Sequence, residues 1–194
     1  MYLMNAEKKE KKSGVRSAKD CACIAVFVAV LLASQLALSA LPGVETVTAL
    51  FAVYAFCFGY KRGWISATAF SLVRQVLFGF FSSVLVLYLV YYNFFVTVFA
   101  WLGKRIKRVA RGMLITVPTA CVCTAVFTLL DCVITPLFYG FSVRASNAYF
   151  YASLSVMFSQ IVCAGVSTAL LFLPLWRAFV LIKRIIDVGE YRKK

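Results

Sequence analysis

Six long apolar runs constrain this chain more than any other feature. They lie at residues 21–41, 44–60, 64–81, 84–102, 113–134 and 149–173. Apolar residues make up 63% of the 194-residue chain, whereas soluble domains contain about 45–50%. A helix needs about 17–25 mostly apolar residues to cross the roughly 30 Å hydrocarbon core of a bilayer. We therefore expect an all-α integral membrane protein, built as a bundle of six transmembrane helices.

The distribution of lysine and arginine predicts how this bundle is oriented. Most of the 21 basic residues fall in the N-terminal tail, the second and fourth connections and the C-terminal end, which share one side if six helices alternate. The first and third connections contain none, and the fifth contains only Arg144. Because basic residues are retained on the cytoplasmic side, both termini are predicted to be cytoplasmic. The expected organisation is a basic tail at 1–20, a membrane domain at 21–174 and a basic interfacial tail at 175–194.

The net charge of +14 does not require nucleic acid as a partner. Each basic residue near an anionic leaflet is worth about 1 kcal/mol, so anionic lipids are the expected partners of the basic side. A signal peptide is the alternative interpretation of the first run, since a basic stretch precedes it and Ala37-Leu38-Ser39 resembles a cleavage site. The run is long for a signal peptide, and its removal would leave five helices.

Several kinds of chemistry lack their usual residues. Histidine is absent, which removes the usual general base and the commonest transition-metal ligand. No Gly-x-x-x-x-Gly-Lys-Ser/Thr loop is present, so the chain by itself cannot hydrolyse ATP in the P-loop manner. Cys21 and Cys23 are two residues apart and face different sides of a helix, as are Cys121 and Cys123, so we interpret the cysteines as small apolar residues. We expect no enzyme activity, cofactor, disulfide or metal site.

Polar residues inside the predicted spans are the candidates for function. Arg74 lies about ten residues into the third run, where an arginine costs at least roughly 2.5 kcal/mol and usually faces the bundle interior. It either pairs structurally with Glu45 or Asp131, or binds a ligand. Three amides also lie within spans, and we favour hydrogen bonds between helices for them. They are Gln35, Asn93 and Gln160.

Aromatic residues gather at the predicted outer ends of the helices. Much of this enrichment is typical of the interfacial belt of membrane proteins. The fifth connection, residues 135–147, also contains hydrogen-bonding groups and the one outer basic residue outside the spans. Such a mixture suits a lid over a small molecule with flat apolar parts and an anionic or polar group.

Four alanines repeat at four-residue spacing along the first run. They are Ala25, Ala29, Ala33 and Ala37, here named the alanine ladder. In lipid, small residues at this spacing let two helix backbones approach closely. The ladder therefore predicts a helix contact, either with another protein or within the bundle.

The chain resembles the substrate-binding S component of energy-coupling factor transporters over nearly its whole length. The alanine ladder carries part of this resemblance. Four further segments carry the rest: residues 41–48 (LPGVETVT), 58–63 (FGYKRG), 88–93 (YLVYYN) and 131–140 (DCVITPLFYG).

The resemblance implies a multi-pass protein of a bacterial plasma membrane that captures a vitamin or related micronutrient outside. Such a protein docks on a membrane coupling subunit driven by two separate ATPase subunits, and rotates in the membrane to release its cargo. The family's docking face maps onto the alanine ladder. Metal-binding members use an N-terminal histidine, so Met1-Tyr2-Leu3 argues against a metal as substrate.

Within this family the outer halves of the helices and the outer connections enclose the substrate. The expected substrate-binding residues are Glu45, Arg74, Tyr88, Asn93, Asp131, Tyr139, Arg144 and Asn147. Two other functions remain open. One is a six-helix scaffold that recruits a cell-envelope complex, and the other is a membrane enzyme that uses Glu45, Asp131 and Arg74 on a lipid or cell-wall precursor.

Overall fold

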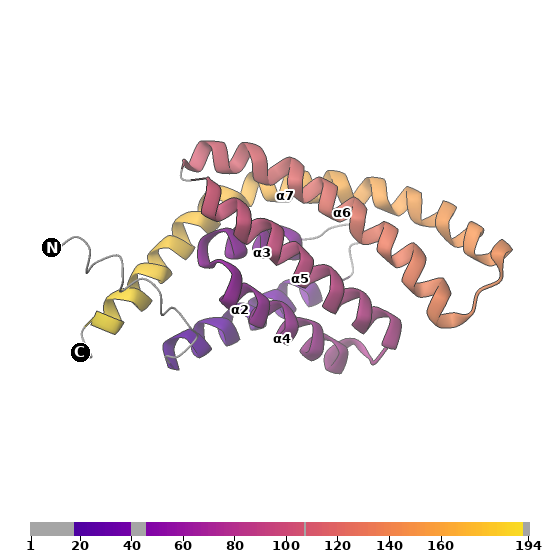
Figure 1. Cartoon of the computed structure of the whole chain (residues 1–194), viewed down its shortest axis with the longest axis horizontal. Coiled ribbons are helices and arrows are strands. Elements are labelled where there is room, and N and C mark those ends of the chain that lie inside the picture. Colours follow the sequence, from indigo (N-terminus) through magenta and orange to yellow (C-terminus); the bar gives the residue numbers. More distant parts are fainter. Residues whose placement is uncertain (1–17, 40–45, 107, 192–194) are drawn as a thin grey trace, which may run out of the picture.

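The computed structural model describes residues 18–39, 46–106 and 108–191, with side chains up to residue 186. Within these residues the chain is helical and contains no strand (Figure 1). The helices are α2 (Ala18–Leu38), α3 (Val47–Phe58), α4 (Tyr60–Phe78), α5 (Ser82–Arg105), α6 (Val109–Tyr139) and α7 (Val143–Tyr191). Glu45 and most of the predicted N-terminal tail lie outside the described residues.

Four of these helices, α2, α5, α6 and α7, are long and apolar enough to cross a membrane. Helix α3 has 12 residues, or about 18 Å at about 1.5 Å per residue, which is shorter than the roughly 30 Å hydrocarbon core. Helix α4 has 19 residues but includes Lys61, Arg62, Arg74 and Gln75, which lower its hydropathy. The chain is therefore a helical membrane protein, and six complete spans remain a prediction.

Helix α3 is the centre of the fold. It packs against α7 and α5, and also contacts α4, α6 and α2. Its residues from Val47 to Ala55 are all buried. A helix that is apolar on every side is stable when neighbours surround it. Over this stretch Thr48 and Tyr54 are the only residues with a polar group in the side chain. Aromatic rings fill the surrounding core, including Phe51 against Phe70 with centroids 5.4 Å apart.

The turn between α3 and α4 lies at Gly59, whereas the apolar runs 44–60 and 64–81 predicted it at residues 61–63, Lys61-Arg62-Gly63. Gly59 has φ of 74°, a left-handed value that glycine adopts without steric cost. Gly63 lies within α4 and lets this helix approach α5, since a Cβ at Gly63 would meet Val96 Cγ1 at 2.5 Å. The prediction of a break between the two helices was correct, but its position was wrong, because Gly63 lies within α4 and packs against α5.

The prediction of a long outer connection at residues 135–147 is wrong. Helix α6 continues through Pro136 to Tyr139, and α7 starts at Val143. Gly140 closes α6 in a left-handed conformation, with the Phe141 N–H donating to the Pro136 carbonyl at 3.0 Å. Ser142 caps α7, because its Oγ accepts from the Ala145 N–H at 3.3 Å. The expected lid is thus a tight turn between two helices.

The α6–α7 hairpin projects past the ends of α4 and α5 (Figure 1). Apolar side chains in the projecting part are highly exposed, as Leu137 at 78% and Tyr151 at 70% show. Helix α7 runs through Pro174 to Tyr191, so most of the tail predicted at 175–194 continues this helix. The C-terminal part of α7 bends away from its first part (Figure 1).

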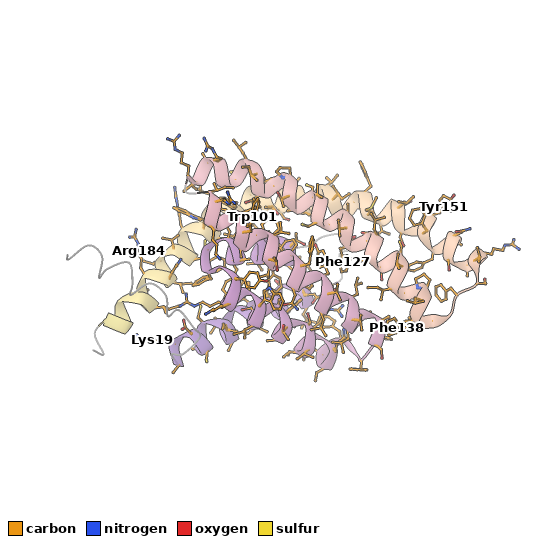
Figure 2. The ribbon with its side chains drawn as sticks, viewed as in Figure 1. Lys19, Trp101, Phe127, Phe138, Tyr151 and Arg184 are labelled. Atoms are coloured by element: carbon orange, nitrogen blue, oxygen red, sulfur yellow. The ribbon has the colours of Figure 1, made fainter. Side chains whose placement is uncertain are left out.

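The labelled charged side chains and two of the labelled aromatic side chains lie at opposite ends of the molecule (Figure 2). Lys19 and Arg184 lie at one end, which we name the basic end, whereas Phe138 and Tyr151 lie at the other, the aromatic end (Figure 2). The start of α2 and the C-terminal part of α7 therefore share the basic end, as an even number of crossings requires. That this end faces the cytoplasm remains a prediction.

Candidate ligand-binding site

Arg74 and Tyr88 are the two predicted binding residues that the structure brings together. Arg74 lies one turn before the aromatic end of α4, and its guanidinium carbon is 4.3 Å from the Tyr88 ring centroid on α5. The Phe78 ring lies one turn further along α4, at 5.2 Å from the same carbon. Each such cation–π contact is worth about 0.5–2 kcal/mol, depending on desolvation. Two rings thus hold the cation in place.

No carboxylate pairs with Arg74 among the described residues. Across that part of the chain the ion pair found is Arg62 with Asp20, at the basic end. The Arg74 Nε is buried and has no hydrogen-bond partner there. Ring faces stabilise a cation but do not accept an N–H hydrogen bond as well as an oxygen does. The Arg74 Nε–H could therefore still donate to an anionic or polar acceptor.

Further buried polar atoms without hydrogen-bond partners lie at the same ends of α2, α3 and α4. They are Gln35 Oε1, Thr46 Oγ1 and Gln75 Nε2. Buried polar atoms in native proteins are almost always hydrogen-bonded, and the exceptions call for a ligand, an ion or a functional explanation. Gln35 also connects to the arginine site directly, because its Nε2 donates to the Tyr88 hydroxyl at 3.5 Å. We name Gln35, Arg74, Gln75 and Tyr88 the polar cluster.

The polar cluster has the chemistry to bind a small molecule with a flat ring and an anionic or carbonyl group. Arg74 supplies a positive charge, and the two glutamine side chains supply an unpaired acceptor and an unpaired donor. Aromatic rings extend the surface, since the Tyr88 ring contacts Phe127 of α6 with centroids 5.9 Å apart. Hydrogen bonds to a charged group are worth about 1.5–3 kcal/mol each.

Asp131 belongs to a separate contact within the α6–α7 hairpin. Its carboxylate accepts from the Thr135 hydroxyl at 2.7 Å and from the Tyr149 hydroxyl at 2.6 Å. The carboxylate thereby links α6 to the first turns of α7. Both of its oxygens have partners, so the pairing with Arg74 that the sequence left open is not formed.

Asn93 lies in the interface between α4 and α5. Its Nδ2 donates to the Leu89 carbonyl at 2.7 Å and to the Thr68 hydroxyl at 3.5 Å. Gln160 makes a comparable contact between α6 and α7, where its Oε1 accepts from Thr128 at 3.3 Å. These amides hydrogen-bond between helices and do not join the polar cluster.

The remaining predicted residues lie on the projecting hairpin or outside the described residues. Tyr139 is 54% exposed at the end of α6, and its hydroxyl accepts from Ser83 at 3.5 Å. Arg144 and Asn147 are exposed in the first turns of α7, not in a loop. Glu45 lies outside the described residues, so its predicted role is not tested.

The alanine ladder lies on the exposed face of α2. Ala25, Ala29, Ala33 and Ala37 are all exposed. The opposite face supplies the core contacts through Ile24, Phe27, Val28, Leu31 and Leu32. Packing within this bundle therefore does not use the ladder, which leaves it available to a partner or to lipid.

An apolar groove runs beside the alanine ladder at the basic end. Its volume is about 430 Å³, and it lies between α2 and the part of α7 that follows Pro174. Ala22, Val26 and Val30 form one wall, and Phe179 and Ile182 form the other. The groove and the ladder thus make one continuous apolar surface on the outside of α2.

No protein-family model, curated protein or solved structure matches this chain. The resemblance to S components therefore rests on the residues of the sequence.

The sequence reasoning missed Gln75, the most deeply buried member of the polar cluster at 2% exposed. The available signal was its position directly after Arg74 in an apolar run. Adjacent residues on a helix point about 100° apart. If Arg74 and Gln75 both face the interior, that interior is wide enough for two polar side chains. Phe78 was noted only as part of the interfacial aromatic belt.

Proposed function

We propose that this chain is the substrate-binding S component of an energy-coupling factor importer. In this role it binds a vitamin or related micronutrient at the polar cluster, on the outer side of a bacterial plasma membrane. It then docks on a membrane coupling subunit, and two separate ATPase subunits supply the energy. The observation that carries the proposal is the half-buried Arg74, whose buried Nε has no acceptor among the described residues.

The charge of Arg74 favours a ligand over a purely structural role. An arginine within a membrane helix usually faces a partner group or a water-filled cavity. The described acidic side chains have other contacts: Asp20 pairs with Arg62, and Asp131 with Thr135 and Tyr149. A cargo with a carboxylate, phosphate or polarised carbonyl would supply the acceptor. The rings of Tyr88 and Phe78 would then favour a cargo with a flat ring.

Helix α2 connects this site to the proposed docking face. Gln35 on α2 contacts Tyr88 in the polar cluster, whereas Ala33 and Ala37 lie exposed on the other side of the same turns. A coupling subunit that packs against the ladder would therefore contact the helix that senses the cargo. Because this chain lacks a P-loop motif, ATP-driven uptake of the P-loop kind would need separate ATPase subunits.

Mass spectrometry of small molecules retained by the purified protein tests the cargo. We expect one ring-containing anionic or amide-rich compound to co-purify with the native protein and to be lost from Arg74→Ala. Arg105→Ala is the control, because it removes an exposed arginine that lies away from the polar cluster, at the end of α5. Equal retention by both variants would return Arg74 to a structural role.

Co-purification tests the docking face. We expect Ala29→Trp to lose the coupling subunit and the ATPases, because a bulky ring prevents close helix approach. Val122→Trp, at an exposed position on α6, is the control and should retain them. Retention of all partners and of full uptake by Ala29→Trp would contradict the docking assignment.

A cell-envelope scaffold is the second candidate, and the exposed ladder with its groove is the observation in its favour. A scaffold would bring down envelope proteins in place of ATPases and would need no cargo. The same two experiments distinguish it, since a scaffold loses its partners in Ala29→Trp but is indifferent to Arg74→Ala.

A further inference from the structure

A second cavity lies at the basic end, away from the polar cluster. Its volume is about 190 Å³, and it opens between the end of α3, the α5–α6 connection and α7. Drug-sized ligands occupy about 300–1,000 Å³, so a cavity of this size suits one compact chemical group. The two charged residues that line it, Arg108 and Lys183, are both basic.

Lys183 is held at this cavity by a contact with α3. Its Nζ donates to the Cys57 carbonyl at 3.0 Å, and Cys57 lines the cavity with it. This carbonyl belongs to the last turn of α3, where carbonyls have no partner within the helix. A lysine ammonium has three donors, so one bond to Cys57 leaves two N–H groups for another acceptor.

The first turn of α6 adds backbone donors at the same place. Arg108 is the N-cap residue of this 31-residue helix, and no side chain caps its N-terminus. The first intrahelical bond runs from the Gly112 N–H to the Arg108 carbonyl, so the preceding N–H groups have no partner within the helix. Val109, the first helical residue, lines the cavity. The positive end of the helix dipole and two basic side chains therefore converge there.

The remaining walls are apolar and aromatic. Phe56, Trp176 and Val180 line the cavity beside the basic residues. Tryptophan is enriched at the level of lipid headgroups, because its ring is apolar and its N–H is polar. Basic pockets between helices on the cytoplasmic side typically bind the headgroups of anionic lipids.

We propose that this cavity binds the phosphate group of an anionic phospholipid from the leaflet at the basic end. Arg108, Lys183 and the first N–H groups of α6 contact the phosphate, and Trp176 and Val180 contact the adjoining apolar part of the lipid. The site is distinct from the diffuse attraction of the basic tails to the membrane surface. It is also independent of the cargo, since it lies at the opposite end from Arg74.

Lipid retention by the full-length protein tests this site. The purified protein is exchanged into mixed micelles with equal amounts of phosphatidylglycerol and phosphatidylcholine, and the lipid that it retains is measured by native mass spectrometry. We expect phosphatidylglycerol to be retained in preference. Arg108→Gln should lower that retention about tenfold, the effect of losing a hydrogen bond to a charged group. Arg108 is exposed, so this variant should keep the fold.

Lys104→Gln is the matched control, because it removes an exposed charge from the same stretch without lining the cavity. Equal losses in Arg108→Gln and Lys104→Gln would overturn the proposal in favour of diffuse charge attraction. Equal retention of the two lipids would overturn the preference for an anionic lipid. Competition with inorganic phosphate distinguishes the two sources of the anion. Persistence of the lipid in excess phosphate supports a lipid site, whereas its complete displacement would show a site for free phosphate and overturn the lipid assignment.

Discussion

Arg62 and Arg74 lie on the same helix and have opposite surroundings. Arg62, at the basic end of α4, forms a 2.7 Å ion pair with Asp20 of α2, and its guanidinium also lies over the Phe58 ring. Arg74, about 18 Å further along at about 1.5 Å per residue, rests on the Tyr88 and Phe78 rings and has no carboxylate partner among the described residues.

We attribute this difference to a structural role of Arg62 and to the proposed ligand-binding role of Arg74. At the basic end the Asp20 carboxylate pairs with Arg62 within the chain, and the Cys57 carbonyl at the end of α3 accepts from Lys183. At the aromatic end the polar cluster has donors and an acceptor that remain unused. We therefore expect the loss of Arg62 mainly to lower the stability of the fold, and the loss of Arg74 mainly to lower the affinity for cargo.

The largest effect is expected for Arg62→Ala. Removal of one partner from a buried ion pair leaves an uncompensated charge and costs about 3–5 kcal/mol. Asp20 is 3% exposed, so its carboxylate would lose its partner inside the bundle. Thermal unfolding in detergent should show a large decrease in Tm for Arg62→Ala. The double variant Asp20→Ala, Arg62→Ala should recover part of it.

Arg105→Ala is the control for this prediction, because Arg105 is exposed and its guanidinium lies over the Trp101 ring. A decrease in Tm for Arg62→Ala no larger than that for Arg105→Ala would remove the structural half of the comparison.

A smaller effect is expected for Tyr149→Phe in the projecting hairpin. This change deletes the hydroxyl that donates to Asp131 at 2.6 Å and leaves a carboxylate oxygen with one partner fewer. The expected cost is about 1–3 kcal/mol. Thermal unfolding should place its Tm between those of the native protein and Arg62→Ala. Tyr151→Phe, at a 70% exposed position, should leave the Tm unchanged.

The smallest stability effect is expected for Arg74→Met in the absence of cargo. The variant loses cation–π contacts worth about 0.5–2 kcal/mol, but it also removes a charge that has no carboxylate partner among the described residues. These contributions oppose each other, so the Tm should change much less than in Arg62→Ala. A decrease as large as that of Arg62→Ala would show that Arg74 has a structural partner, with Glu45 as the first candidate.

The sequence predicted the helical membrane class and approximate helix positions, because long apolar runs report directly on burial in lipid. It also separated the basic connections from the aromatic ones. The boundaries were less accurate where helices continue through residues that usually end them. Pro136 lies inside α6, and the predicted outer lid is a tight turn at Gly140.

The candidate site was predicted in part. Arg74 and Tyr88 were identified and lie together, because a charge inside an apolar run is visible without a structure. Asp131 was expected to belong to the same region, but its carboxylate accepts a hydrogen bond from Tyr149. No sequence pattern specifies which faces of two helices distant in the chain will meet. Gln75 was missed for the same reason, since its burial depends on how α4 is rotated in the bundle.

The affinity for the cargo tests the central claim most directly. Once the retained compound is identified, its Kd is measured by titration for the native protein, Arg74→Gln and Arg105→Gln. We predict that Arg74→Gln weakens binding about 10-fold to 100-fold, as expected when hydrogen bonds to a charged group are lost, and that Arg105→Gln leaves the Kd unchanged. An unchanged Kd for Arg74→Gln would contradict the account and leave Arg74 a structural residue.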